Sequence, residues 1–186
     1  MNNKTLAHDN IHNEKFDINY QIKPNNWEMM LNTSSRKTEK LDGLWNFAID
    51  IYDSGIRNKF FDEITKDDMR RDIPVDFDFD EWEKVRVPSN WNMVNKEYLY
   101  YEGTAWYTRK FKFYKTSTDE RVFLKIGAAN YECRIWLNKK LIARHIGGYT
   151  PFFVEITDFL EEENRILIMV NNTRVKNGVP ALNTDW

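Results

Sequence analysis

The stretch "ECRIWLNKKLIARHIGGYTPFFVE", residues 132–155, decides the fold of this protein. Cys133, Ile135 and Leu137 occupy alternate positions, which is typical of a strand that packs one face on a core. The "NKK" that follows is typical of a hairpin turn, so a second strand should return beside the first. The same stretch predicts that Cys133 is a core residue rather than a reactive thiol.

Two of the chain's 7 glycines stand side by side at 147–148, directly after this second strand. Glycine tolerates positive φ, so the pair predicts a tight turn. Pro151 has no N–H and should stop sheet pairing at the entry to the next strand. The turn could also carry a sugar-recognising surface.

Outward from this stretch, other segments alternate in the same way: "LWNFAI" (44–49), "KVRV" (84–87), "TAWYTRKFKFY" (104–114), "RVFLKI" (121–126) and "NRILIMVNN" (164–172). The last is apolar on both faces from 166 to 170 and should lie inside the fold. Residues 60–82 are charged, contain a proline and lack a sustained period, which predicts a surface excursion with one short helix. No strand–helix alternation is present, so the predicted class is all-β, with two antiparallel sheets packed face to face.

Composition argues against several kinds of partner. The chain has 27 basic and 29 acidic residues without a basic stripe, so a nucleic-acid partner is not expected. The single cysteine excludes an internal disulfide and is typical of a reducing compartment. The polar N-terminus does not read as a signal peptide, and the sequence has no apolar run long enough to cross a membrane, so the expected location is cytoplasmic.

The residues themselves point to binding rather than catalysis. His8, His12 and His145 are far apart in the sequence, so no metal site is predicted. The sequence also lacks a phosphate-binding glycine loop, so no cofactor is predicted. The acidic residues of "DFDFDEW" (76–82) are interpreted as a solvated loop rather than as an acid/base pair. Aromatic residues make up 15% of the chain, which suits sheet cores and surfaces that face sugars. These features predict an aromatic-rich β-sandwich that serves as a binding or accessory module.

Six segments, read in order, resemble the N-terminal sugar-binding domain of family 2 glycoside hydrolases, which include β-galactosidases, β-glucuronidases and β-mannosidases. They are "LDGLWNFAID", "WEKVRVPSNW", "YEGTAWYTRKF", "ANYECRIWLNKKLIARHIGGYTPFFVEITDFL", "ENRILIMVNN" and "VPALNTDW". The segments "HIGGYTPF" and "GTAWYTRKF" are most similar to the β-glucuronidase branch, whereas "VPSNW" is shared with β-galactosidases. The resemblance covers residues 25–186, after a polar arm at 1–24, and implies a jelly-roll β-sandwich of the galactose-binding type. It also implies that the turn at 147–148 is chiefly structural, with Tyr149 and Phe152 packing at the end of the sandwich.

The resemblance also implies what surrounds this domain in a complete enzyme. An immunoglobulin-like domain and a TIM barrel with two catalytic glutamates should follow, so residues 1–186 hold no catalytic residue and should be inactive alone. The implied partners are a β-glycoside substrate and the barrel of the same chain, in a homo-oligomer. The chain ends where the family needs a further strand, which suggests a truncated piece of a retaining β-glycosidase. The alternative is a free-standing carbohydrate-binding or assembly module.

The resemblance supplies the candidate binding residues. Asp185 in "NTDW" should reach the mouth of the barrel and accept hydrogen bonds from sugar hydroxyls, a task that suits a carboxylate. Asn183 and Trp186 are secondary candidates beside it. The loop "NMVNKEYLYYEG" (92–103) is expected to border the same site, with Asn92 and Tyr101 as its candidate residues.

Overall fold

The structure, a computed structural model, describes residues 36–62, 64–66, 69–74 and 79–174, and only the backbone of 64–66 and 72–74. All of them belong to one unit of the chain, residues 32–186. The described strands are β1 (Gly43–Asp50), β2 (Ile64–Lys66), β3 (Asp72–Pro74), β4 (Glu83–Val87), β5 (Thr104–Lys112), β6 (Phe123–Ile126), β7 (Glu132–Leu137), β8 (Lys140–Ile146), β9 (Phe152–Glu155) and β10 (Glu163–Asn171). Three short 3-10 turns accompany them: η1 (Phe79–Glu81), η2 (Trp91–Met93) and η3 (Lys96–Tyr98). The predicted all-β class is therefore confirmed, and no helix among the described residues is long and apolar enough to cross a membrane.

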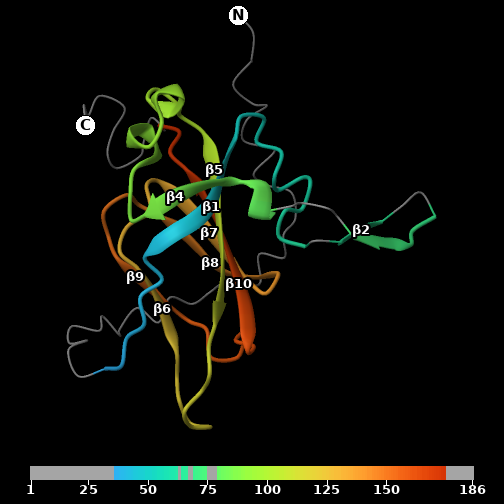
Figure 1. Cartoon of the computed structure of the whole chain (residues 1–186), viewed down its shortest axis with the longest axis vertical. Coiled ribbons are helices and arrows are strands. Elements are labelled where there is room, and N and C mark those ends of the chain that lie inside the picture. Colours follow the sequence, from blue (N-terminus) through green and yellow to red (C-terminus); the bar gives the residue numbers. More distant parts are fainter. Residues whose placement is uncertain (1–35, 63, 67–68, 75–78, 175–186) are drawn as a thin grey trace, which may run out of the picture. The chain divides into compact units, whose positions relative to one another are not determined.

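The main sheet is antiparallel and has the strand order β4-β1-β5-β10-β7-β8. Its central strands β5 and β10 pair along their whole length and run side by side in Figure 1. Because β10 pairs with β5 on one side and with β7 on the other, the prediction that 166–170 lie inside the fold is confirmed. Strands β6 and β9 form a second, smaller sheet, and β2 and β3 form a separate hairpin.

The hairpin of β7 and β8 has the predicted turn at "NKK". Leu137 pairs with Lys140, which leaves Asn138 and Lys139 as a two-residue loop. Both have positive φ, 49° and 72°. Positive φ at both central residues defines the type I′ turn, whose twist matches that of the flanking strands.

Strand β7 is buried on both faces. Cys133, Ile135 and Leu137 are 0–1% exposed on the predicted core face. Trp136, which points to the opposite face, is also only 2% exposed. The opposite face of the main sheet therefore carries a covering layer of its own.

Aromatic residues among the described part of the segment 51–82 contribute that layer, which corrects part of the sequence prediction. Trp106, Trp136, Leu167 and Met169 of the sheet form one buried cluster with Phe79. Phe60, Phe61 and Trp82 pack against this cluster, and the Phe61 and Trp136 rings stack in parallel at 5.2 Å. The segment does contain one short helix, η1, as predicted, but it is more than a surface excursion. Its irregularly spaced aromatic residues are used in tertiary packing rather than in a periodic element.

Asp50 fixes the point where this segment leaves the sheet. Its buried carboxylate accepts hydrogen bonds from Ser54 N (2.8 Å), Gly55 N (2.7 Å) and Trp106 Nε1 (3.1 Å). A Cβ atom on Gly55 would lie 2.5 Å from the Trp106 indole, so no larger residue fits there. The turn therefore holds the start of the 51–82 segment against the sheet.

The two glycines after β8 are each required at their positions for a different structural reason. Gly147 has φ of 138°, as the predicted positive-φ turn requires. A Cβ on Gly148 would lie 2.7 Å from Asn130 Oδ1, so Gly148 is needed for close approach. Phe152 stacks on the His145 ring at 4.2 Å, whereas Tyr149 is 56% exposed.

Candidate functional site

The candidate site lies at the end of the main sheet where β5 begins. The connection from β4 to β5, residues 88–103, forms this end together with the residues that follow β10. Two asparagines shape the start of the connection. Asn90 accepts a hydrogen bond from Asn92 N at 2.9 Å, and Asn95 accepts one from Glu97 N at 3.2 Å, so each begins a 3-10 turn.

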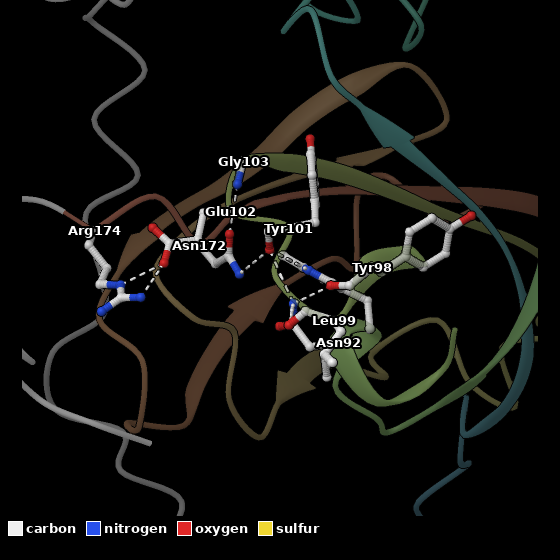
Figure 2. Close-up of polar contacts among 9 residues, drawn as sticks. Asn92, Tyr98, Leu99, Tyr101, Glu102, Gly103, Asn172 and Arg174 are labelled. Carbon is white, nitrogen blue, oxygen red and sulfur yellow. Dashed lines mark hydrogen bonds and ion pairs between the residues drawn. The ribbon is translucent and has the colours of Figure 1, made fainter. Parts of the chain in front are cut away.

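Asn92, a predicted site residue, closes this connection into a compact loop. Its amide nitrogen lies 2.5 Å from the Tyr98 carbonyl oxygen and 3.2 Å from the carbonyl oxygens of Leu99 and Tyr101. Figure 2 shows the amide pointing toward these three carbonyls. Its donor hydrogens are therefore engaged by the backbone, and its observed contacts shape the loop.

Tyr101, the second predicted residue in this loop, is oriented by a backbone contact. Its hydroxyl donates to the Thr104 carbonyl at 2.8 Å. Burial, aided by the negative charges of Asp50 and Asp53, raises the pKa of Tyr101 to about 12. The side chain is thus a neutral phenol at physiological pH.

Gly103 allows the loop to approach the Tyr101 ring. A Cβ at this position would lie 2.6 Å from the Tyr101 hydroxyl oxygen, and φ is 154°. Both facts require glycine here. In the "YEG" that precedes β5, Gly103 therefore makes room for the Tyr101 side chain.

The segment after β10 is tied to the same loop. Gly103 N donates to Asn172 Oδ1 at 2.8 Å, and Asn172 N donates to the Gly103 carbonyl at 3.1 Å. Arg174 Nε donates to Glu102 Oε1 at 2.7 Å and forms an ion pair with the same carboxylate (Figure 2). Residues 172–174 therefore leave the sheet in direct contact with the loop.

Sequence reasoning missed Glu102, Asn172 and Arg174. The antiparallel pairing of β5 with β10, which joins Thr104 to Asn171, is the signal that could have found them. Residues before the start of one strand must then lie beside residues after the end of the other. The remaining candidates, Asn183, Asp185 and Trp186, lie outside the described residues.

The loop also presents aromatic and apolar side chains to solvent. Tyr100 is 90% exposed and Met93 is 80% exposed. Tyr98 is half-buried, and its hydroxyl donates to Glu83 Oε2 at 2.8 Å. Burial and this carboxylate raise the pKa of Tyr98 to about 12. Neutral phenols beside exposed apolar side chains suit hydrogen bonding to hydroxyl groups and contact with the apolar face of a sugar ring.

The described residues provide neither a reactive thiol nor a metal site. Cys133 is buried, and burial raises the pKa of its thiol to about 12, so it is not a nucleophile at neutral pH. Within the described ranges, no group of three or more His, Cys, Asp or Glu side chains is placed to hold a metal ion.

The comparison with family models agrees with this picture. Residues 38–179 match the family "Glycosyl hydrolases family 2, sugar binding domain". The chain belongs to this family, and the predicted jelly-roll β-sandwich is confirmed.

Curated relatives of the chain are β-glucuronidases. The mouse enzyme is 29% identical over 155 residues, which are 78% of this chain and 23% of the relative. The human enzyme is 30% identical over 161 residues, with the same coverage of 78% and 23%. The enzyme of Streptococcus agalactiae is 30% identical over 142 residues, 75% of this chain and 20% of the relative. The chain thus spans about a quarter or less of the length of these relatives.

Solved structures show the same relationship. A β-glucuronidase from an uncultured Clostridium species is 29% identical, with a TM-score of 0.67 over 81% of this chain and 25% of that one. The Lactobacillus rhamnosus β-glucuronidase is 26% identical, with a TM-score of 0.63 over 77% of this chain and 22% of that one. In both cases the similarity is to one part of a much longer enzyme.

Proposed function

We propose that this chain is the N-terminal sugar-binding domain of a retaining β-glycosidase of the β-glucuronidase type. In this role it shapes the pocket for a terminal β-glycoside and supports assembly of the enzyme, while the catalytic carboxylates come from another part of the protein. The observation that carries the proposal is the similarity to β-glucuronidases over about three quarters of the chain. The chain corresponds to less than a quarter of the length of those enzymes, which supports a binding role for this chain and a catalytic role for the rest of the protein.

The candidate site supports this role through the position of the loop 92–103. Asn172 and Arg174, which precede Asn183, Asp185 and Trp186 in the sequence, contact this loop. Asp185 is proposed to accept hydrogen bonds from sugar hydroxyls, with Asn183 and Trp186 beside it. Asn92 and Tyr101 contribute by holding the loop that borders the pocket.

The test compares two proteins with two substrates. The 186-residue chain and the product of the complete reading frame that encodes it are assayed with 4-nitrophenyl β-D-glucuronide and with the β-D-galactoside. We expect the longer product to hydrolyse the glucuronide in preference to the galactoside, and the chain alone to show no turnover above background. Preference for the galactoside would remove the β-glucuronidase assignment.

Two further outcomes decide against the proposal. A reading frame that stops at Trp186, with a product that binds sugars without cleaving them, would favour the free-standing carbohydrate-binding or assembly module. Turnover by the chain alone, retained through repurification and lost on a point substitution within 1–186, would place the catalytic residues in this domain.

A further inference from the structure

The end of the main sheet that carries the loop 92–103 also exposes a group of large apolar side chains. More than half of the exposed large apolar side chains of the described residues lie there, and six of them form what we call the apolar patch: Ile51, Tyr52, Met93, Leu99, Tyr100 and Ile146. Their exposed fractions run from 45% for Leu99 to 90% for Tyr100. Single exposed apolar residues are normal on a protein surface, but a group of them marks an interaction surface.

Strand register places these side chains at one end of the fold. One row of paired residues crosses the main sheet: Asp50, Thr104, Asn171, Glu132 and Ile146. Ile51 and Tyr52 directly follow this row on β1, and Tyr100 shortly precedes it on β5. Neighbouring strands lie 4.7–4.9 Å apart, so the five strands that carry the row span about 19 Å. A single sugar ring covers only part of such a width, so most of the patch requires a larger partner.

The backbone that carries the patch is held in place. Thr104 Oγ1 donates to Asp53 Oδ1 at 2.7 Å, and the Tyr101 hydroxyl donates to the Thr104 carbonyl at 2.8 Å, so the turn after β1 lies beside the loop. The three carbonyl contacts of Asn92 fix the loop itself. A surface whose backbone is already ordered loses little conformational freedom when a partner binds.

The opposite end of the main sheet has a different surface. Lys110 stands six residues along β5 from Thr104, which places it about 20 Å from the loop end at 3.3–3.4 Å per residue. Lys112 and Glu163 form an ion pair there at 2.9 Å, with side chains that are 62% and 74% exposed. Charged residues are typical of a surface that stays in water, whereas tyrosine and methionine are enriched in protein interfaces. The patch is therefore a property of the loop end.

The path of the chain indicates which partner covers the patch. Asn172 and Arg174, which follow β10, contact Gly103 and Glu102 of the loop, so the polypeptide leaves the sheet at the patch. The chain spans 23% of the length of the mouse relative. Further parts of the same protein would thus start beside the patch, and a contact within one polypeptide is favoured over a contact with a second molecule by its high effective concentration.

We propose that the apolar patch is the docking surface for the catalytic part of the same enzyme. This inference rests on the proposed function and deepens it by assigning the residues of the contact. Tyr52, Met93 and Tyr100 become buried against the catalytic part. The loop 92–103 is then held from inside by Asn92 and from outside by the docked part, which fixes the border of the sugar pocket.

The experiment measures oxidation of Met93 in the 186-residue chain and in the product of the complete reading frame. Both are treated with dilute hydrogen peroxide, and methionine sulfoxide is measured by mass spectrometry. Met93 is 80% exposed, so it should oxidise readily in the chain alone. In the longer product we expect a rate lower by about tenfold or more, because oxidation requires access to the sulfur. Met69, which is 76% exposed and lies outside the patch, is the internal control and should oxidise at the same rate in both proteins.

Two matched double variants of the longer product test the patch itself. Ile51→Ser/Tyr100→Ser should raise the Met93 oxidation rate by about tenfold, because a weaker contact opens more often. Leu44→Ser/Tyr114→Ser changes side chains at the opposite end that are 60% and 59% exposed, and it should leave the rate unchanged. Both pairs of substitutions should leave the melting temperature of the 186-residue chain nearly unchanged, as changes of exposed side chains usually do.

Equal oxidation of Met93 in the two proteins would overturn the proposal, and so would equal protection of Met69 and Met93. Protection of Met93 in the 186-residue chain that grows with protein concentration would assign the patch to a second copy instead. A rim of contact that survives Ile51→Ser/Tyr100→Ser, with Met93 still protected, would show that these side chains do not form the docking surface. A reading frame that stops at Trp186 would also overturn it.

The docking surface and the proposed function fail separately. Met93 oxidation does not depend on which glycoside is cleaved, so a preference for the galactoside would remove the β-glucuronidase assignment and leave the docking surface standing. An active glucuronidase with an unprotected Met93 would overturn the docking surface alone.

Discussion

At the scale of single residues, Asn92 is the side chain that most clearly determines the shape of the candidate site. Its amide nitrogen lies within hydrogen-bonding distance of three backbone carbonyls of the loop that it begins. Each net hydrogen bond contributes about 0.5–1.5 kcal/mol. We therefore expect Asn92→Ala to lower the free energy of unfolding by about 1–3 kcal/mol, measured by urea denaturation.

Asn95→Ala provides the matched control for Asn92. Asn95 caps η3 through a single hydrogen bond to Glu97 N, so its loss should cost about 1 kcal/mol or less. If the Asn92 variant is no less stable than the Asn95 variant, the three carbonyl contacts do not hold the loop.

Tyr101 gives a prediction about alkaline pH. Its pKa is raised to about 12 in the folded protein, whereas an unfolded tyrosine titrates near 10. The unfolded state therefore loses this proton first, so the stabilisation is present below about pH 10 and is lost as pH rises from 10 to 12. A pH titration of the folded protein followed by absorbance at 295 nm should show a tyrosine that ionises near pH 12 and is missing in Tyr101→Phe. In 8 M urea the same substitution should remove a tyrosine that titrates near pH 10. If the substitution also removes a titration near pH 10 in the folded protein, Tyr101 is not buried as the structure shows.

At the scale of secondary-structure elements, β7 tests whether the main sheet is covered on both faces. Ile135→Ala should cost about 2–5 kcal/mol and Trp136→Ala about 3–5 kcal/mol, as large-to-small substitutions in cores do. Thermal or urea unfolding should show both to be severe, with Arg86→Ala on the exposed side of the edge strand β4 within about 0.5 kcal/mol of the unchanged protein. A mild Trp136→Ala would mean that the 51–82 segment does not cover the sheet.

The same elements show what the sequence could predict about the fold. Alternation in 44–49, 104–112 and 132–137 identified β1, β5 and β7, because period-two patterning follows directly from strand geometry. The turn at "NKK" was predictable for a similar reason. The covering layer was not, since Phe60, Phe61 and Trp82 are placed by tertiary packing on Trp106 and Trp136 and follow no local period.

The candidate site was predictable only where a local motif specified it. Asn92 and Tyr101 lie in a quoted loop motif, and the structure shows their contacts within that loop. The contributions of Glu102 and Arg174 depend on the pairing of two strands that are separated by about fifty residues of sequence, so no local pattern contains them. Strand register therefore had to be known before the partner of the loop could be named.

At the scale of the whole molecule, the two ends of the main sheet carry different side chains. The loop end gathers exposed aromatic side chains and the segment that follows β10, whereas the opposite end gathers cations around Lys110 and Arg165. This separation means that substitutions at the two ends should have independent effects on the free energy of unfolding. Variants more than 7–10 Å apart with no shared partner usually have additive effects.

The last prediction concerns Asp185 in the longer enzyme. If Asp185 accepts hydrogen bonds from sugar hydroxyls, Asp185→Ala should lower kcat/KM for the glucuronide while leaving the melting temperature nearly unchanged. Hydrogen bonds to charged groups contribute about 1.5–3 kcal/mol, which corresponds to a loss of roughly ten- to a hundredfold. Asp185→Asn should recover part of that loss, because an amide oxygen still accepts a hydrogen bond but carries no charge. Kinetics equal to those of the unchanged enzyme would remove Asp185 from the site, whereas a large fall in melting temperature would make its role structural. The isolated chain cannot report this difference, since a contact to substrate is expressed in kcat/KM only where the catalytic carboxylates are also present.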